Sequence, residues 1–382
     1  MSWYECTLGD LITLKRGHDL PNTSRIEGDI PVVSSSGITG YHNEAKAKPP
    51  GVVTGRYGTL GEVFYIEQDY WPLNTALYII DFKDTGPRFS AYFLKNTLKS
   101  YKSDKAAVPG VDRNVLHALK VRAPDRGTQE RVVEVLSKYD YLIENNKRRI
   151  ELLEESARQL YKEWFVRYRF PGHEHVKIID GVPEGWIKDT VANVCSKFID
   201  GDWIETKDQG GEDYRILQIS NIGVDAFVET RNLRFISEST FDRLNCSEVR
   251  PGDLIIARMP THIGRAWLVT DMPWKMVTAV DVTIAKNDGT KIDTFYLLHH
   301  LNSEQHIARC EAGATGATRP RVARKVMGTL PILVPPLSLQ EEFAELAQSS
   351  HNIKTNLIRQ NEQLARARDI LLPKLMSGEI AV

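Results

Sequence analysis

Three side chains near the start of the chain have the types that metal-dependent nucleases use: Asp29, Glu44 and Lys46. Carboxylates can hold a divalent cation, and a lysine can stabilise charge that develops in a transition state. Such triplets are common by chance, and nothing equivalent stands in the second half of the chain, where much of the sequence is repeated. A nuclease-like centre is therefore an alternative with little support.

Two histidine pairs could suggest a metal site: His173 with His175, and His299 with His300. Neither pair has an evident third ligand, so we interpret them as exposed or structural histidines. The cysteines are far apart and include no C-x-x-C pair, which argues against a zinc site and a disulfide framework. They are Cys6, Cys195, Cys246 and Cys310.

The motifs of nucleotide and methyl-transfer chemistry are missing. The segments KPPG at residues 48–51 and VPPL at residues 334–337 lack the Asn or Asp and the aromatic residue that flank the Pro-Pro pair of adenine methyltransferases. No phosphate-binding G-x-x-x-x-G-K-[ST] loop occurs, and the glycines at residues 55–61 have the wrong spacing for a dinucleotide loop. We therefore expect no catalytic centre, no metal and no cofactor.

The composition is that of an ordinary globular protein: 42% of the 382 residues are hydrophobic and 26% are charged. This length predicts two or three domains. The first residues, MSWYEC, do not resemble a signal peptide, and no stretch approaches the roughly 20 apolar residues that span a bilayer. We therefore expect a soluble, cytoplasmic protein without membrane contact. A net charge of −1 argues against nucleic-acid binding unless basic and acidic surfaces are segregated.

The sequence contains an internal repeat. Residues 3–10 resemble residues 186–193, which lie 183 positions later. Residues 50–61 resemble residues 251–264 when one or two insertions are allowed. This part of the comparison pairs Arg56 with Arg258, Gly61 with Gly264, and Trp71 with Trp274.

The firmest match needs no gap, and it aligns residues 119–130 with residues 330–341 at an offset of 211. The same offset pairs Pro109 with Pro320, Gln129 with Gln340, and Asn145 with Asn356. Offsets that grow along the chain in one order predict a duplicated domain with insertions in the second copy. A period near 200 residues excludes a solenoid.

Each copy begins with a globular part in which short strands alternate with turn signals, and short helices are expected at residues 88–98 and 294–300. The fold class that this pattern predicts is α+β, with irregular strands. The expected strands are residues 51–54, 62–66 and 76–80 in the first copy, and 253–257, 266–269 and 280–285 in the second.

A long amphipathic helix is expected after each globular part. In the first helix, the spacing alternates between four and three along Val132, Leu136, Tyr139, Ile143, Asn146, Ile150, Leu153, Ala157, Leu160 and Trp164. This heptad spacing predicts a coiled-coil seam in a helix of about 40 residues, roughly 60 Å long. The second seam is expected to be shorter and more polar, with Pro373 breaking the helix. It consists of Phe343, Leu346, Ser350, Ile353, Leu357, Leu364 and Leu371.

A strict heptad seam favours packing against a partner helix over packing against a sheet, which requires a broader apolar stripe. We therefore expect the two long helices to pair with each other in antiparallel orientation, which would give an internal pseudo-two-fold repeat. Asn146 and Asn361 fall in or beside the seam and are expected to help fix its register.

This organisation resembles the specificity subunits of type I restriction-modification systems. The matching segments are GRYGTLG at residues 55–61, WPLNTALY at residues 71–78, PDRGTQER at residues 124–131, PLSLQEEF at residues 336–343 and LPKLMSGEI at residues 372–380. The resemblance covers the whole chain, although the second copy has Met259 and Pro260 where the first has Tyr57 and Gly58.

The resemblance implies two target-recognition domains, each reading one half of a bipartite, asymmetric site in double-stranded DNA. The implied boundaries are residues 1–126 and 171–338 for these domains, and residues 127–170 and 339–382 for the two helices. The helices would space the half-sites and dock two methyltransferase subunits. Those subunits and the restriction (translocase) subunits would carry all the chemistry. For partner binding, the helix residues expected to matter are Leu153, Leu160, Trp164, Leu364 and Leu371.

Base reading needs polar or bidentate side chains, and phosphate binding needs cations. The candidates in the first copy are Ser34, Ser35, Ser36, Thr39, Arg56, Tyr57 and Arg113. The candidates in the second copy are Gln218, Ser220, Asn221, Arg258, Thr261, His262, Arg319, Arg321, Arg324 and Lys325. The alternatives are a simple turn for the serines and a solvated charged face for the arginines. A coiled-coil scaffold without a DNA role would explain the helices but not two related, divergent globular parts.

Overall fold

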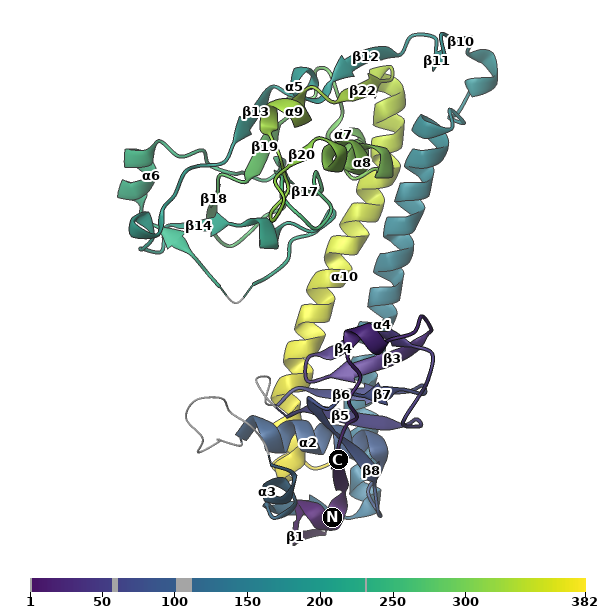
Figure 1. Ribbon diagram of the computed structural model, residues 1–382, viewed down its shortest axis with the longest axis vertical. Helices are drawn as coiled ribbons and strands as arrows, with labels where there is room; N and C mark the ends of the chain where they lie inside the picture. The colour runs from purple at the N-terminus through teal and green to yellow at the C-terminus, as the bar shows by residue number, and fades with distance from the viewer. Residues whose placement is uncertain (1, 57–60, 101–111, 231) are drawn as a thin grey trace. The chain divides into compact units, whose positions relative to one another are not determined.

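A computed structural model describes residues 2–56, 61–100, 112–230 and 232–382. The chain divides into two compact units, which we call unit 1 (Met1–Arg148 with Leu357–Val382) and unit 2 (Arg149–Asn356). The long helices α4 (Arg126–Tyr161) and α10 (Leu337–Ser377) each contribute residues to both units (Figure 1). Within the described parts of the chain, neither of them nor any shorter helix combines the length and apolar character needed to cross a bilayer.

Unit 1 contains two small sheets and a two-stranded pair, β1 (Trp3–Thr7) with β9 (Lys120–Pro124). The four-stranded sheet has the order β2 (Thr13–Arg16), β8 (Ala76–Asp81), β5 (Gly51–Gly55), β6 (Val63–Ile66). The three-stranded sheet has the order β4 (Gly37–His42), β3 (Ile30–Ser34), β7 (Trp71–Pro72). Its shorter helices are α1 (Leu8–Leu11), α2 (Pro87–Ser100) and α3 (Arg113–His117).

Unit 2 has a four-stranded sheet in the order β13 (Lys197–Asp200), β19 (Val282–Lys286), β16 (Leu254–Ala257), β17 (Ala266–Leu268). A three-stranded sheet has the order β15 (Phe235–Ile236), β14 (Tyr214–Leu217), β18 (Lys275–Thr278). The two-stranded pairs are β12 (Ile187–Thr190) with β22 (Pro331–Val334), β10 (Ile178–Ile179) with β11 (Val182–Pro183), and β20 (Ala314–Thr315) with β21 (Arg321–Val322). The shorter helices are α5 (Val191–Val194), α6 (Glu238–Leu244), α7 (Thr294–Leu301), α8 (Glu304–Ala312) and α9 (Arg324–Gly328).

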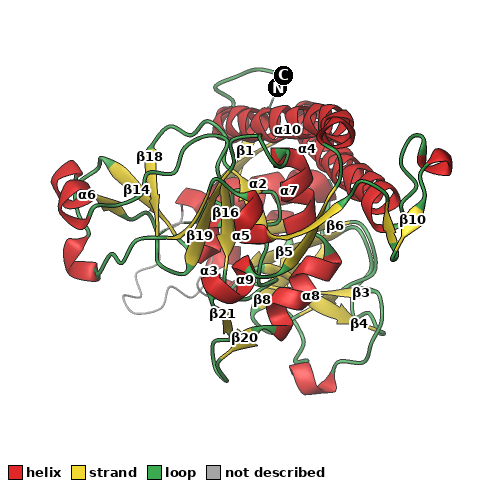
Figure 2. Ribbon diagram, turned by 90° about the horizontal axis from the view of Figure 1, so that it is seen from above, coloured by secondary structure: helices red, strands yellow, loops and turns green. Residues whose placement is uncertain are grey.

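The two units share one strand order. Each four-stranded sheet is antiparallel, and each three-stranded sheet contains one parallel pair, β3 with β7 and β14 with β18. Figure 2 shows the short strands and the loops that join them. Even a close backbone approach recurs: a Cβ atom on Gly17 would lie 2.1 Å from the carbonyl oxygen of Leu73, and one on Gly201 would lie 2.2 Å from that of Ala279. Only glycine fits at either position.

A buried glutamine joins the start of each long helix to the globular part before it. Its side-chain oxygen accepts a hydrogen bond from the backbone N–H just before α2 or α7, and its amide donates to the proline carbonyl five residues upstream. In unit 1, Gln129 contacts Gly86 at 3.4 Å and Pro124 at 3.1 Å. In unit 2, Gln340 contacts Asp293 at 2.9 Å and Pro335 at 2.7 Å. The glutamines paired by the offset of 211 therefore have the same structural role.

The long helices complete the core of each unit. In unit 1, Val132 and Leu136 of α4 are buried in one cluster with Leu372 and Leu375 of α10. In unit 2, Phe343 of α10 is buried with Tyr161, and with Trp164 of the π-helical turn Lys162–Val166 that follows α4. Burying a side chain of this size contributes about 1.5–3 kcal/mol. The helices are therefore held mainly by tertiary packing rather than by helix propensity alone.

Within unit 1, α4 and α10 run in opposite directions. Asp140 accepts a hydrogen bond from Arg368 at 2.6 Å, and Asn146 donates to Asn361 at 3.0 Å, so residue numbers rise along one helix as they fall along the other. In unit 2, Glu154 lies 3.4 Å from Lys354 and Trp164 contacts Phe343, so residue numbers again rise along one helical segment as they fall along the other. Asn146 and Asn361, which the sequence places in or beside the seam, therefore contact each other.

Two expectations for the second long helix are wrong. Leu346 and Ile353 are 50% and 41% exposed, and the buried positions are Ala347 and Lys354. Pro373 also does not break the helix: α10 continues through it to Ser377 and is longer than α4. Proline removes one backbone donor near the end of the helix, but burial of the neighbouring residues Leu372, Leu375 and Met376 holds the last turn in place.

Candidate functional site

The two units differ where their three-stranded sheets turn. In unit 1, β3 and β4 are joined by the two-residue turn Ser35–Ser36, because Ser34 is paired with Gly37. The Ser34 hydroxyl is buried and donates to the carbonyl of Gly37 at 3.2 Å, while it accepts from the N–H of Ser36 at 3.1 Å. Ser34 thus stabilises the turn, whereas Ser36 and Thr39 are the candidate DNA-contact residues of this hairpin whose side chains are exposed.

In unit 2 a much longer connection joins β14 and β15, and we call residues 218–230 the recognition loop. This loop and the segment 259–265 enclose a groove of about 540 Å³. Three residues expected from the sequence to contact DNA lie around this groove: Ser220, Thr261 and His262, all exposed. The fold thus brings together side chains that are about 40 positions apart in the sequence.

Arg265 holds the groove together and was not expected from the sequence. Its side chain is 6% exposed and donates to the carbonyls of Ile222 at 2.6 Å and Ile219 at 3.0 Å in the recognition loop. It also donates to Met259 at 3.0 Å in the opposite segment. Burial lowers the pKa of Arg265. Among the described residues it has no carboxylate partner within ion-pair distance, so its positive charge beneath the groove is compensated only by backbone dipoles.

Gln218 and Asn221 belong to the inner frame of the recognition loop. Asn221 is 2% exposed, accepts from the N–H of Gln218 at 3.0 Å and donates to the carbonyl of Val228 at 2.9 Å. These bonds occupy its amide within the loop, which disfavours a direct base contact. Gln218 is half-buried, and its side-chain NH₂ has no hydrogen-bond partner. It remains a candidate donor toward a ligand.

The paired arginines Arg56 and Arg258 do not present equivalent free side chains. Arg258 is 2% exposed, lies 3.2 Å from Asp200 and donates to the carbonyl of Val280. Burial lowers its pKa, although the charge of Asp200 acts in the opposite direction. This inward orientation disfavours the expected DNA contact for Arg258. Arg56 is half-buried, and its neighbour Tyr57 lies outside the described residues.

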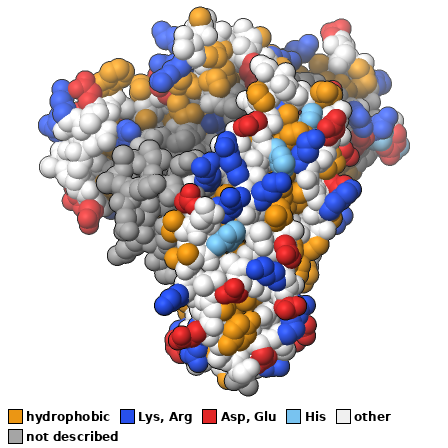
Figure 3. Space-filling model, turned by 60° about the horizontal axis from the view of Figure 1, so that its bottom comes forward, with side chains coloured by type: hydrophobic (Ala, Val, Ile, Leu, Met, Phe, Trp, Pro, Cys, Tyr) orange, Lys and Arg blue, Asp and Glu red, His pale blue; other side chains and the backbone are white. Residues whose placement is uncertain are grey.

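The basic run near α9 is partly neutralised by acids. Arg321 lies 2.9 Å from Asp281, and Arg324 lies 2.9 Å from Asp200. Among the described residues, Arg319 and Lys325 are the exposed cations of the run that form no ion pair, while Arg113 is exposed at the equivalent helix of unit 1, α3. Figure 3 shows basic and acidic side chains interspersed on one face of the molecule, in keeping with the net charge of −1.

The helix residues expected to bind partners are mostly used within the chain. Trp164 is 7% exposed and packs against Phe343, while Leu160 and Leu371 pack against the cores of units 2 and 1 respectively. Leu153 and Leu364 are half-buried. The exposed apolar side chains of α4 and α10 are different ones. They are Tyr141, Leu142 and Leu152 on α4, and Leu337, Leu346, Ile353, Ile358 and Ile370 on α10.

Features of a catalytic metal site are not found in the part of the chain that the structure describes. No group of three or more His, Cys, Asp or Glu side chains is arranged to hold an ion there. Glu44 instead pairs with Lys46 at 3.8 Å. His299 lies near the end of α7, where burial lowers its pKa to about 4 and keeps the ring neutral.

Comparison with known proteins gives one consistent result. Residues 2–155 match the type I restriction modification DNA specificity domain. The chain is 24% identical over 305 residues to the type I restriction enzyme MjaVIII specificity subunit of Methanocaldococcus jannaschii, covering 77% of this chain and 70% of that protein. The MjaIX specificity subunit of the same organism is also 24% identical, over 306 residues, covering 76% of this chain and 68% of that protein.

The crystal structure of the S subunit of a type I restriction-modification system from M. genitalium has a similar fold. It is 16% identical in sequence and superposes with a TM-score of 0.56, covering 98% of this chain and 96% of that one. The resemblance predicted from the sequence and the α+β fold class are thereby confirmed.

Proposed function

We propose that this chain, as a type I restriction-modification specificity subunit, is the DNA reader of a modification and restriction complex. It would bind double-stranded DNA at a bipartite, asymmetric site and would itself perform no catalysis. Two methyltransferase subunits would dock on it, and these, together with the restriction subunits, would carry the chemistry.

The observation that carries the proposal is one strand order used twice with different loops. A two-residue turn joins β3 to β4, whereas the recognition loop occupies the equivalent position between β14 and β15. Rigid scaffolds commonly present variable loops for binding. Two copies of one scaffold with different loops at the same place suit two readers of different half-sites.

We assign residues 1–126 and 171–338 to the two target-recognition domains, and residues 127–170 and 339–382 to the helices. An antiparallel coiled coil of these helices would relate the domains by a pseudo-two-fold axis. The pairs Asn146–Asn361 in unit 1 and Glu154–Lys354 in unit 2 support this pairing. The helices would then act as a ruler for the gap between half-sites, at about 3.4 Å per base pair.

In unit 2, base reading is assigned to the groove, with Ser220, Thr261 and His262 at its rim and Gln218 in its inner frame. Arg319 and Lys325 are assigned to phosphates because they are exposed cations. In unit 1, the corresponding assignments are Ser36 and Thr39 to bases and Arg113 to phosphate. In unit 2, Arg258 and Asn221 are assigned supporting roles beneath the reading surface rather than contacts with DNA.

The exposed apolar side chains of α4 and α10 are the surfaces that we assign to the methyltransferase subunits. Leu152 is 63% exposed and Ile370 is 55% exposed, on helices whose opposite sides are already buried. Exposed apolar side chains on these two helices are candidates for contacts with partner subunits.

The test is co-expression of the chain with the methyltransferase encoded beside it, followed by mapping of methylated adenines in the host DNA. We expect one bipartite motif with a fixed gap, and replacement of residues 171–338 by the same domain of another specificity subunit should change one side of it only. Absence of both a partner complex and a methylation change would reject the proposal and favour a scaffold without a DNA role.

A further inference from the structure

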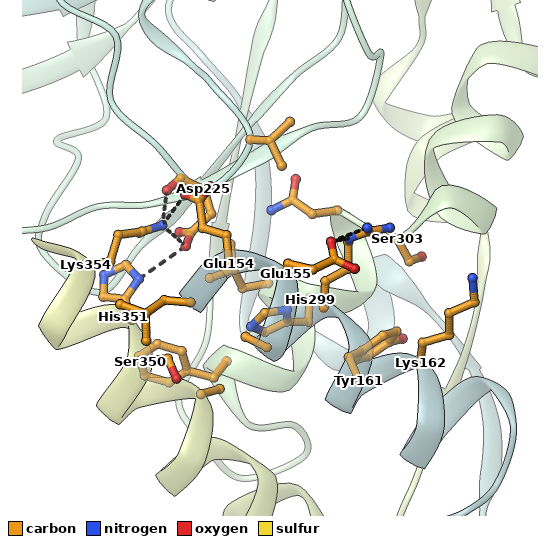
Figure 4. A pocket seen from close by; sticks show the side chains of 18 of the residues that line it. Glu154, Glu155, Tyr161, Lys162, Asp225, His299, Ser303, Ser350, His351 and Lys354 are labelled. Atoms are coloured by element: carbon orange, nitrogen blue, oxygen red, sulfur yellow. Dashed lines mark hydrogen bonds and ion pairs between the residues drawn. The ribbon is translucent and has the colours of Figure 1, made fainter. Parts of the chain in front are cut away.

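The recognition loop is fastened to α10 by a buried ionic cluster. Asp225, at the outer end of the loop, has a positive φ of 43° and lies against His351 and Lys354 of α10 (Figure 4). Lys354 donates to the Asp225 carboxylate and, at 2.7 Å, to its backbone carbonyl. The ring nitrogen Nδ1 of His351 lies 3.3 Å from the same carboxylate. One residue of the loop thus accepts contacts from two successive turns of the helix.

Burial makes this attachment specific. The side chain of Lys354 is only 5% exposed, and that of His351 is 10% exposed. Lysine is almost never buried unless it is paired, and here Asp225 and Glu154, the latter at 3.4 Å, supply the negative charge. Burial alone would raise the pKa of Asp225, but the hydrogen bond from His351 and the charge of Lys354 hold that pKa below its usual value. The carboxylate is therefore ionised, and the cluster is a charged contact at neutral pH.

The loop has a second attachment on its other side. The backbone N–H of Asp225 donates to the carbonyl of Ala266 in β17 at 2.8 Å. Ala266 directly follows Arg265, which binds the carbonyls of Ile219 and Ile222 in the same loop. Asp225 therefore ties the loop to α10 through its side chain and to the sheet through its backbone.

The attached loop is also a wall of the groove. Ser220, Gly223 and Val228 of the recognition loop line it, and Val224, next to Asp225, lines both this groove and a neighbouring cavity of about 460 Å³. The cluster of Asp225, His351 and Lys354 lies at the wall of that cavity. A shift of Asp225 relative to α10 would therefore move the side of the groove that carries Ser220.

In the described residues of unit 1, this cluster has no counterpart. The offset of 211 that relates the two helices places Asp140 and Ile143 of α4 at the positions of His351 and Lys354. Ile143 cannot carry charge, and the β3–β4 turn is two residues long, which is too short to supply an equivalent of Asp225. The attachment to α10 therefore depends on the longer loop of unit 2.

We propose that Asp225, His351 and Lys354 form an anchor that positions the recognition loop for reading one half-site. These are positioning residues and would not touch DNA. The inference rests on the proposed function in assigning base reading to the groove, but the anchoring itself is a property of the chain alone.

The test is the Lys354→Met variant of the full chain, which keeps the length of the side chain and removes its charge. The first readout is amide hydrogen exchange in residues 219–230, measured without DNA or partners. Loss of a charge-assisted hydrogen bond of the usual strength predicts exchange faster by about tenfold or more in this segment. The second readout is the methylation motif after co-expression. We expect relaxed base preference in the half-site read by unit 2 and an unchanged preference in the other.

Lys286→Met is the matched control. Lys286 is a partly buried lysine of the same unit, 3.0 Å from Asp253 and 3.1 Å from the carbonyl of Glu248, and neither of these partners lies in the recognition loop. It should leave the exchange of residues 219–230 and both half-sites unchanged. If Lys354→Met does not fold, Asp225→Asn replaces it, because that change preserves shape and weakens the same contacts.

The outcomes separate the anchor from the proposed function. Unchanged exchange in residues 219–230 would overturn the anchor, whatever the DNA result. Faster exchange with both half-sites intact would show that the contact does not position the reading surface, and would equally overturn the inference. If the wild-type complex methylates no bipartite motif, the proposed function fails, while the exchange result still decides whether the cluster anchors the loop.

Discussion

Replacing Asn361 by leucine should destabilise unit 1, whereas replacing both Asn361 and Asn146 should not. Asn146 is 6% exposed and donates its amide N–H to Asn361 at 3.0 Å. The single change leaves this buried amide without its partner, which costs about 1–3 kcal/mol. Since Asn361 is only half-buried and the new leucine gains some apolar contact, we expect a net loss of about 1–2 kcal/mol.

The double variant removes both polar groups, and two leucines then face each other in the seam. Replacing both members of a buried hydrogen-bonded pair by apolar residues is nearly neutral or stabilising. We therefore expect stability equal to or above that of the wild type, and a coupling free energy of about 1–3 kcal/mol between the two positions. The pair of asparagines would thus be less stabilising than a pair of leucines, but it favours the one alignment of α4 and α10 in which the two amides meet.

The assay is urea unfolding followed by hydrogen exchange in peptides of residues 132–148 and 357–376, because a chain of two units need not unfold in one step. Asn145→Leu is the control: Asn145 is the exposed neighbour of Asn146, and its replacement should change the stability by less than about 0.5 kcal/mol. Additive effects of the two replacements, or a double variant less stable than either single one, would refute the reasoning.

Three further predictions follow from named contacts. Gln340→Leu should destabilise unit 2 and Gln129→Leu unit 1, each by about 2–4 kcal/mol, because each change leaves one buried and one partly buried backbone group without its hydrogen-bond partner. Hydrogen-exchange rates measured separately for each unit would show equal losses in both units if this assignment is wrong. Burial lowers the pKa of His306 to about 4 and that of His300 well below its usual value, so the unfolded state takes up protons first as pH falls below 6.5. Unit 2 should therefore lose about 2 kcal/mol per histidine between pH 7 and pH 5, measured by urea titration at both pH values, and His306→Gln should reduce the loss. In the assembled complex, Lys325→Ala should weaken binding to all DNA sequences and reduce the slope of log affinity against log salt concentration by about 1, whereas His262→Ala should relax the base preference in one half-site. Binding measured over a range of salt concentrations would show these two effects exchanged if His262 contacts phosphate and Lys325 contacts a base.

Two positions that the sequence repeat pairs have structural roles that few residues can fill. Gln129 and Gln340 each satisfy two backbone groups at the start of a long helix, so neither changes without loss. Some of the core contacts of α4 could be predicted as well, since Val132, Leu136 and Ala157 of the expected apolar series are buried. Both signals are local or periodic, and such signals are the ones that a single sequence carries best.

The groove could be predicted only in part. Ser220, Thr261 and His262 were found as polar residues in turns, but nothing in the sequence indicates that the two turns meet around Arg265. A buried arginine that is paired only with carbonyl oxygens looks like any surface arginine in a sequence, because its partners are backbone atoms. The burial of Arg258 could not be predicted for another reason: its partners, the Asp200 carboxylate and the Val280 carbonyl, lie 58 and 22 positions away in the sequence.

The misplaced seam of α10 has a physical reason that bears on how the helices are aligned. Lys354, Asn361 and Arg368 recur at a spacing of seven residues, and each meets a polar residue of α4 within its own unit: Glu154, Asn146 and Asp140. Periodicity assigns seams to apolar residues, so it indicates Ile353 rather than Lys354 and does not indicate Arg368, whereas Asn361 is expected in or beside the seam. A slip of one heptad in one direction would place Lys354 level with Tyr161, and in the other Arg368 level with Val133, both in apolar clusters. Either slip would separate Lys354 from Glu154 and Arg368 from Asp140 and would place one of the two cations against apolar side chains, which disfavours both slips. The residues that make the seam hard to find in the sequence are therefore the ones that fix its register.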